Sequence, residues 1–214
     1  MIRKAVILFF SLCLTNGAFT QSESGLELIL GVNNSNFQFT NSLGELQSEY
    51  MSQSSQLIGV QANRSSKRSS LRFGATFREG GAIYNEPNLS VSWKINYLGV
   101  SAGYLFAVIN KPKIKIYPGL SYYLGYMLNG QQLVNQEIIS LNDGKLIKKI
   151  DHGVEPLLGV KYRLFDNISL SIEHRLGLGL AQLENNPMNQ KTYNRFSSFV
   201  VGLGITLNTK KSEE

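Results

Sequence analysis

Apolar and polar residues alternate along the second half of the chain. In residues 113–128, one set of alternate positions runs from Ile114 to Leu128 and is apolar or aromatic throughout. The other set begins with Lys113 and Lys115 and continues with glycine, serine, tyrosine and methionine. Successive side chains of a β-strand point to opposite faces, so this pattern predicts a strand with one greasy face. The same alternation recurs in residues 153–164, 168–181 and 198–207.

Charges and glycines gather on the same face of these four segments. The charged members are Lys113, Lys115, Glu155, Lys161, Arg163, Glu173 and Arg175. Every glycine of the four segments shares their side, whereas leucine, isoleucine, valine and tyrosine fill the other, where His174 is the only interruption. Two residue classes that sort together in this way indicate two faces in different surroundings.

The first half of the chain carries a weaker form of the same pattern. Apolar residues alternate with polar or small ones in residues 26–32, 58–62, 71–78 and 98–108. Together with the four later segments, this predicts eight strands. An even number lets both ends of the mature chain lie on one side of a membrane, as bacterial barrels require.

The predicted connections alternate in length. Short links at 64–67, 109–112 and 165–167 separate long ones at about 40–53, 80–96, 129–151 and 183–195. Outer-membrane barrels have short periplasmic turns and longer external loops in this order. No segment after the N-terminus is long and apolar enough for a transmembrane helix. The sequence therefore predicts an all-β, eight-stranded antiparallel up-and-down transmembrane β-barrel.

The direction of the two faces separates a membrane barrel from a soluble lipocalin-like lipid carrier, which would hold its apolar face inside. The interior of an eight-stranded barrel is only just wide enough to be filled by side chains. The face that carries the glycines therefore suits the inside. This places the charges in the lumen and the bulky hydrocarbon against lipid.

A network of opposite charges is expected in that lumen, because buried charge is tolerated when it is paired or hydrated. We expect such a network to fill the barrel lumen, with surplus basic residues near the solvent-exposed ends of the barrel. Its predicted members are Glu27, Arg72, Arg78, Lys113, Lys115, Glu155, Lys161, Arg163, Glu173 and Arg175. The candidates for aromatic girdles at the membrane interfaces are Tyr84, Trp93, Tyr97, Tyr122, Tyr126 and Tyr162. Tyr84 and Trp93 could equally pack within a loop.

The first twenty residues resemble a secretory signal. They combine Arg3 and Lys4, an apolar stretch at 5–14 and small residues before a predicted cleavage ahead of Gln21. We therefore expect a signal peptide at 1–20 and an outer-membrane barrel domain at 21–214.

The chain has a net charge of +6, but its basic residues occur singly or in pairs, which argues against a nucleic-acid partner.

No constellation for catalysis, a cofactor or a metal emerges from the sequence. The two histidines, His152 and His174, lie in separate segments without a nucleophile, and no His-x-Ser arrangement occurs. Glu155 and Glu173 could form an acid/base pair, but pairing with the basic residues of their own face is the stronger expectation. The only cysteine, Cys13, lies in the predicted signal, so the mature chain offers no cysteine site.

The third long loop offers a possible docking surface. Asn142-Asp143-Gly144 lies between short alternating runs, which predicts a β-hairpin beyond the membrane. Asp143, Lys145, Lys148 and Lys149 give this loop its charge. It can serve an envelope protein partner or anionic lipopolysaccharide; alternatively, it is a solvated extension of two strands.

The order of these segments resembles the bacterial outer-membrane β-barrel domain family typified by PorT-like proteins. The likeness is carried by YLGVSAGYLF from Tyr97, IYPGLSYYLGYML from Ile116, DHGVEPLLGVKYRL from Asp151, SLSIEHRLGLGL from Ser169 and FVVGLGITL from Phe199. The resemblance implies a small non-enzymatic barrel without a cofactor, some relatives of which assist secretion or surface-protein maturation. A narrow transporter or pore and a lipid-modifying barrel enzyme remain as alternatives.

Overall fold

The computed structural model describes residues 22–41, 43, 45–47, 50–135, 137–144, 146–184 and 191–207. The predicted signal peptide at 1–20 lies outside them. The described residues form one sheet of eleven strands, and none of their helices could span a membrane. Three strands are short: β2 (Leu46–Gln47), β6 (Ile109–Asn110) and β8 (Glu137–Ser140). The eight long strands are β1 (Ser22–Thr40), β3 (Met51–Ser66), β4 (Ser69–Glu86), β5 (Leu89–Phe106), β7 (Ile114–Val134), β9 (Ile150–Arg163), β10 (Ile168–Gly179) and β11 (Lys191–Leu207).

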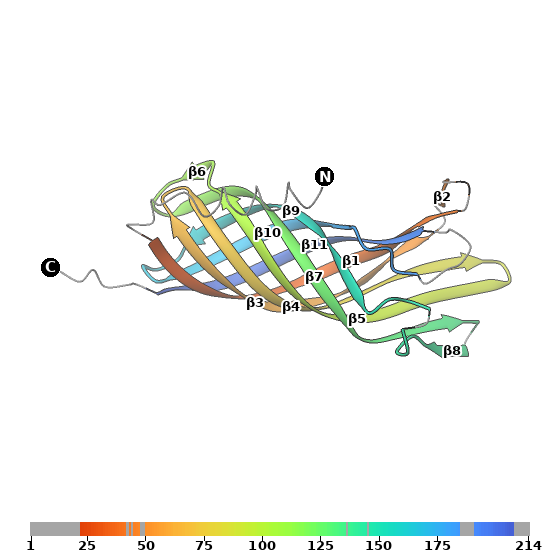
Figure 1. Ribbon diagram of the computed structural model, residues 1–214. Coiled ribbons are helices and arrows are strands. Elements are labelled where there is room, and N and C mark those ends of the chain that lie inside the picture. The colour runs from red at the N-terminus through yellow and green to blue at the C-terminus, as the bar shows by residue number, and fades with distance from the viewer. Residues whose placement is uncertain are drawn as a thin grey trace.

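The eight long strands close into an antiparallel up-and-down barrel (Figure 1). Each pairs with the next long strand along the chain, and β11 returns to pair with β1 from Ser24↔Leu207 to Thr40↔Lys191. Closure leaves no long strand with a free edge over its barrel portion, which is what a sheet in lipid needs. The predicted fold is confirmed.

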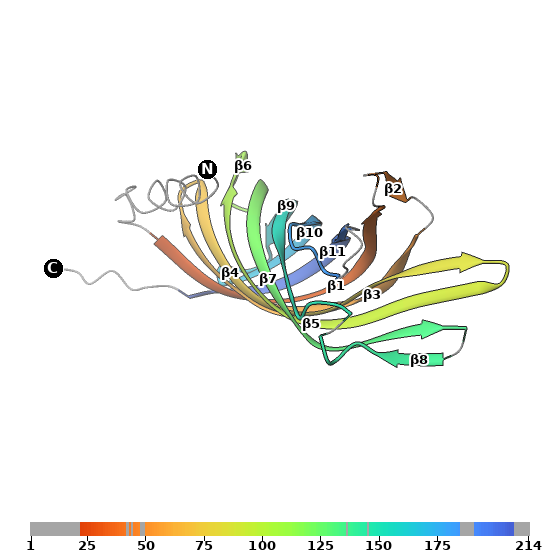
Figure 2. The same cartoon turned by 45° about the vertical axis from the view of Figure 1, so that its right-hand side comes forward.

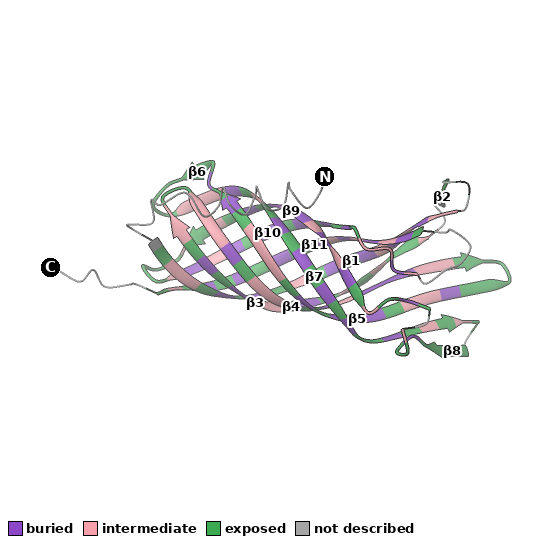
Figure 3. Ribbon diagram, viewed as in Figure 1, coloured by how far each residue is buried: buried purple, intermediate pink, exposed green. Residues whose placement is uncertain are grey.

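Side chains alternate between the two surfaces of the barrel along each strand, as the bands of Figure 3 show. On the outside, Leu28, Leu120 and Leu203 are 50%, 46% and 52% exposed, whereas inward-facing Glu27 and Glu173 are buried. The apolar face therefore surrounds the barrel and the charged face lines it. This is the reverse of what a lipocalin-like carrier requires.

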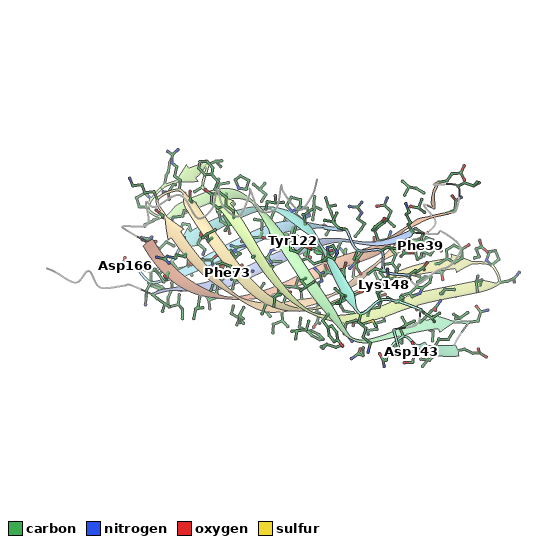
Figure 4. The ribbon with its side chains drawn as sticks, in the orientation of Figure 1. Phe39, Phe73, Tyr122, Asp143, Lys148 and Asp166 are labelled. Carbon is green, nitrogen blue, oxygen red and sulfur yellow. The ribbon has the colours of Figure 1, made fainter. Side chains whose placement is uncertain are left out.

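Connections differ between the two ends of the barrel. β6 and the turn between β3 and β4 lie at one end, and β2 and β8 lie at the other (Figure 1). Since periplasmic turns are short and external loops long, the end with β6 is periplasmic. In Figure 4, Asp166 marks that end and Asp143 the external one.

The predicted long loop at 80–96 was wrong. β4 continues to Glu86 and β5 begins at Leu89, so only residues 87–88 form the turn. Isoleucine, tyrosine and valine beyond the glycine pair at 80–81 favour strand, and Pro87-Asn88 suits a tight turn. The glycine pair lies within the strand, where a Cβ atom on Gly81 would come within 1.9 Å of the Trp93 carbonyl oxygen.

Several strands reach beyond the membrane on the external side. β4 has 18 residues and β7 has 21, whereas a membrane-spanning strand needs about 9–11. The outer parts of β4, β5 and β7 remain paired and are joined by β8. They form a four-stranded sheet, here called the external sheet, which projects past the other strands (Figure 2).

Candidate functional site

Glu173 on β10 is the centre of the lumenal charge network. Its carboxylate accepts hydrogen bonds from Arg72 on β4, with nitrogen–oxygen distances of 2.7 and 2.9 Å, and from Arg175 at 2.5 and 2.9 Å. The Tyr117 hydroxyl donates a third contact at 2.6 Å. Arg175 also lies 3.8 Å from Glu155. These charged side chains are buried, and their ion pairs replace the contacts with water that burial removes.

The network continues toward β1 through an amide. Arg72 Nε donates to Asn63 Oδ1 at 2.9 Å, and Asn63 Nδ2 donates to Glu27 at 3.2 Å. Glu27 also accepts from Lys161 at 3.3 Å and from the Ser171 hydroxyl. Six of the long strands, β1, β3, β4, β7, β9 and β10, are thus tied across the lumen.

A second charge pair lies nearer the external end. Arg78 approaches Asp151 at 3.6 Å, and Asn194 donates to the same carboxylate at 2.9 Å. The Arg78 guanidinium lies 3.9 Å from the centre of the Phe196 ring and 4.5 Å from that of Tyr123. Cation–π contacts and the ion pair therefore fix the position of the Arg78 guanidinium.

Sequence reasoning missed Asp151, which is fully buried. It was placed at the end of the third loop, and the strand was expected to begin at Gly153. β9 instead begins at Ile150. Counting back by two from inward-facing Gly153 places Asp151 on the lumenal face, so the alternation itself carried the signal. Asn63 and Tyr117 were missed because only charged residues were considered.

The remaining predicted members lie outside the central network. Lys113 is exposed and Lys115 half-buried at the start of β7 and its approach. Arg163 is 38% exposed and lies 3.9 Å from half-exposed Glu23. All three belong to the periplasmic end, whereas the buried glutamates pair with Arg72, Arg175 and Lys161.

Glycine makes room for the large lumenal side chains. A Cβ atom on Gly159 would lie 2.6 Å from the Tyr117 ring, and one on Gly177 would lie 2.0 Å from the Phe196 ring. These are the rings that pack beside Glu173 and Arg78. Glycine in these strands therefore creates the space that the network occupies.

An aromatic cluster fills the external half of the lumen. Phe39 stacks on Tyr50 with a centroid distance of 3.9 Å, and Trp93 lies 5.8 to 6.1 Å from Phe39, Tyr50 and Phe37. The buried members of this external cluster are Phe37, Phe39, Ala82, Ile95, Tyr97, Met127, Leu141, Ile147 and Leu183. The outer strand segments thus turn apolar side chains inward, in contrast to the charged half.

Two external loops close over this cluster. Leu141, Ile147 and Leu183 are buried in it although they belong to the loops after β8 and β10. The Lys148 amide donates to the Leu183 carbonyl at 2.7 Å, and Ile147 forms a β-bridge with Glu184. The loops are therefore joined to each other as well as to the barrel.

The third loop contains a β-hairpin, as predicted, but not at Asn142–Gly144. These residues form a turn, in which the Gly144 amide donates to the Leu141 carbonyl at 3.3 Å, but the turn joins no pair of strands. The hairpin joins β7 to β8 around Asn135, which has a φ of +45°. Asn135 also accepts a hydrogen bond from Ser90 of the neighbouring hairpin at 2.9 Å. Asparagine tolerates positive φ, and burial of Leu141 holds the Asn142–Gly144 segment against the barrel.

Two of the charged residues of this loop are exposed in the structure. Asp143 and Lys148 are exposed and Lys149 is half-buried, whereas Lys145 lies outside the described residues. Figure 4 shows Asp143 beside the hairpin of β7 and β8. This loop therefore combines a buried apolar side with a polar outer side.

Three of the tyrosines predicted for the aromatic girdles face outward, as a girdle requires. Tyr122, Tyr126 and Tyr162 lie on the outside, 44–50% exposed. Tyr97 is fully buried in the external cluster and Trp93 packs against it, so the assignment of these two residues to a girdle was wrong. Tyr97 directly precedes outward-facing Leu98, and adjacent strand residues face opposite ways.

The histidines make local contacts on the outer surface. His152 Nδ1 lies 2.9 Å from the Tyr122 hydroxyl, and His174 Nε2 lies 2.9 Å from the Ser197 hydroxyl. Within the described residues, no three His, Cys, Asp or Glu side chains are grouped to hold a metal ion. The histidines stand apart from the lumenal network.

An apolar outer wall, a paired charged lumen and eight closed strands together define a transmembrane β-barrel of the bacterial outer membrane. The sequence profile of the family described as "Outer membrane protein beta-barrel domain" matches residues 5–206. The chain belongs to this family. Its outer wall contacts the lipid of that membrane, which includes lipopolysaccharide.

Several solved structures are similar to this chain. Neisserial surface protein A is 14% identical, with a TM-score of 0.46, over 84% of this chain and 97% of that one. The attachment invasion locus protein Ail of Yersinia pestis is 11% identical, with a TM-score of 0.47, over 86% and 99%. The outer membrane protease OmpT from Escherichia coli is 8% identical, with a TM-score of 0.41, over 86% and 97%. Among curated proteins, none matches.

Proposed function

We propose that this protein is a non-enzymatic structural or interaction protein that presents its external sheet and loops to an envelope protein partner. The observation that carries the proposal is the contrast between a filled lumen and a projecting edge. Buried ion pairs and the external cluster occupy the inside, whereas β8 extends the sheet outside the membrane. A filled lumen disfavours a transport role, so the external surface is the stronger candidate.

The edge of β8 is suited to strand addition. In the described part of the chain, β8 pairs with β7 alone, so its other side is open. Ile138 is 70% exposed, and it faces Leu133, which is 39% exposed. Backbone groups on an open edge give affinity to an added strand, and neighbouring side chains give selectivity.

The charged loop borders the same surface. Lys148 and Asp143 are exposed there, so a partner with an extended apolar segment and mixed charge fits this region. Binding to an envelope protein in this way suits a role in secretion or surface-protein maturation, as the likeness to PorT-like proteins implies. Anionic lipopolysaccharide is the competing ligand for Lys148 and Lys149.

Substitutions at Ile138 test strand addition. In a hairpin with a two-residue loop, the pair next to the loop is hydrogen-bonded, so the Ile138 amide points to the open edge. Ile138→Pro removes that donor, and Ile138→Lys keeps it but removes the apolar contact. Leu43→Lys is the matched control, because Leu43 is 82% exposed on another external loop.

The readout is mild crosslinking and co-purification from native membranes. We expect one envelope protein to be recovered with the unaltered chain and with Leu43→Lys, and to be lost with both Ile138 variants. Retention of every partner by both variants would exclude docking at this edge. Heat-modifiable migration on a gel checks that each variant is a folded barrel.

Two further measurements address the alternatives. A narrow pore predicts stepwise conductance in planar bilayers, whereas the filled lumen predicts none. A lipid-modifying enzyme predicts that the purified protein changes the mass of lipopolysaccharide or phospholipid, and our proposal predicts no change. Either a conductance step or a lipid product would replace the interaction role.

A further inference from the structure

The periplasmic mouth of the barrel contains two adjoining recesses of about 60 Å³ each. They share four lining residues, Asn63, Ser65, Lys115 and Lys161, so we treat them as one periplasmic vestibule. A cavity needs roughly 10–15 Å³ to hold a water molecule. The vestibule therefore has room for several waters or for a small tetrahedral oxyanion.

Positive charge dominates the lining of the vestibule. Its cationic residues nearest the mouth are Lys67, Arg68, Lys113, Lys115, Lys161 and Arg163. Glu23 is the one carboxylate among the described lining residues, and it lies 3.9 Å from Arg163. Lys161 is directed to Glu27 deeper in the lumen. The remaining cations have no carboxylate within ion-pair distance among the residues that the structure describes.

This excess contrasts with the balanced charges deeper inside. Arg72 and Arg175 share Glu173, and Arg78 has Asp151. At the vestibule, Lys115 is half-buried beside Lys161 and Lys113 in the same lining. A recess lined by one sign of charge focuses its field and concentrates counter-ions. The cationic side chains of the vestibule therefore repel one another, and a bound anion would relieve this repulsion.

Neutral hydrogen-bond donors accompany the lysines. Ser65, Ser69 and Ser70 line the vestibule together with the Asn63 amide, but the Ser69 hydroxyl is turned away and accepts a hydrogen bond from Tyr104 at 2.7 Å. The Ser65 and Ser70 hydroxyls lie 2.9 Å apart, so one hydrogen of the pair remains available to a ligand oxygen. Lysine acts as a point-charge binder of phosphate, and hydroxyls complete the coordination of its several oxygens. Phosphate, with more than one charge, suits this lining better than a single carboxylate.

We propose that the periplasmic vestibule is a binding site for a phosphate group. The group can come from a soluble periplasmic phosphate compound or from a phospholipid headgroup of the inner leaflet. Both sources present the same oxygens to Lys115, Lys113 and the serine hydroxyls. The site is at the opposite end from the external sheet, so it stands or falls independently of the proposed partner interaction.

Inorganic phosphate is the probe in the first experiment. The full-length protein is titrated in a non-ionic, phosphate-free detergent, and binding is followed by calorimetry and by amide NMR shifts. The test variant is the double substitution Lys113→Gln, Lys115→Gln. The matched control is Lys94→Gln, Lys191→Gln, which removes the same charge from two exposed lysines at the external end.

We expect phosphate to shift the amides of Ser65, Ser69 and Lys115, and the test variant to bind about tenfold more weakly, the order expected for loss of charge-assisted contacts. The control variant should bind as the unaltered chain does. Equal weakening in both variants would reduce the effect to net charge and overturn the site. Heat-modifiable migration verifies that all three proteins are folded.

Repeating the titration in phospholipid nanodiscs separates the two sources. Loss of phosphate binding there, with the vestibule amides already shifted in the unaltered chain but not in the test variant, assigns the site to a lipid headgroup. Unchanged phosphate binding assigns it to a soluble compound. Absence of vestibule shifts in detergent and in nanodiscs alike would overturn the proposal.

Discussion

The two halves of the barrel interior are filled by different chemistry. In the periplasmic half, Glu173 is enclosed by Arg72, Arg175 and Tyr117. In the external half, beyond the Arg78–Asp151 pair, the lumen is filled by aromatic and aliphatic side chains such as Phe37 and Leu141. Buried charges depend on one fixed geometry of donors and acceptors, whereas apolar packing depends mainly on volume. The first kind of filling is therefore sensitive to the loss of a single partner and the second to the loss of bulk.

The largest effect is expected from Glu173→Gln. This change keeps the shape of the side chain but leaves Arg72 and Arg175 buried without their shared carboxylate, so we expect a loss of about 3–5 kcal/mol in unfolding free energy. Urea titration in lipid vesicles, followed by fluorescence of the single tryptophan, measures it. A loss below about 1 kcal/mol would show that water reaches the network.

A smaller loss is expected from Leu141→Ala in the external cluster. Truncation of a fully buried leucine leaves a cavity and costs about 2–4 kcal/mol. The emission of Trp93, which packs against the same cluster, should shift to the red in the folded state. Leu146→Ala in the same loop is the control, because Leu146 is 50% exposed; we expect it to stay within about 0.5 kcal/mol.

A substitution that overpacks the charged half should lower the unfolding free energy by less than Leu141→Ala does. Gly177→Ala places a methyl group 2.0 Å from the Phe196 ring, which must move away from Arg78, and we expect a loss of about 1–3 kcal/mol. Gly80→Ala is the matched change in the external half, where the nearest atom lies 3.4 Å away on Tyr97. The same urea titration compares them, and equal stability of the two variants would contradict tight packing around Arg78.

The smallest effect is expected from Lys94→Gln. Lys94 lies 3.4 Å from Glu79, but its side chain is 50% exposed, and exposed pairs contribute about 0–1 kcal/mol. The loss should shrink further in high salt. A loss as large as that of Glu173→Gln would mean that burial does not determine how much an ion pair contributes to the stability of this barrel.

Strand alternation predicted the barrel because one face meets lipid and the other meets a narrow lumen. Leu120 faces outward and Glu155 faces the lumen, as the alternation of apolar and polar positions predicted. The external half was less predictable, since Phe37 and Met127 are apolar and yet face inward. Above the membrane, the inside is the dry side, so the relation between polarity and face reverses.

The site was predictable in its charges and less so in its connections. Parity identified Glu27, Arg72 and Glu173, but which arginine meets which glutamate depends on register across strands far apart in sequence. The hairpin lies at Asn135 instead of Asn142–Gly144 for a related reason. Asn142 and Asn135 both carry turn chemistry, and only the burial of Leu141 in a distant cluster decides between them.

The seam between β1 and β11 joins the first and last strands of the barrel, with Leu26 opposite Ile205. A nascent chain that still lacks residues 191–207 therefore has an open rim on each side, and hydrocarbon offers nothing to satisfy those backbone groups. Insertion into the bilayer has to wait for the last strand to be exported. A chain truncated before β11 is therefore expected to stay out of the membrane.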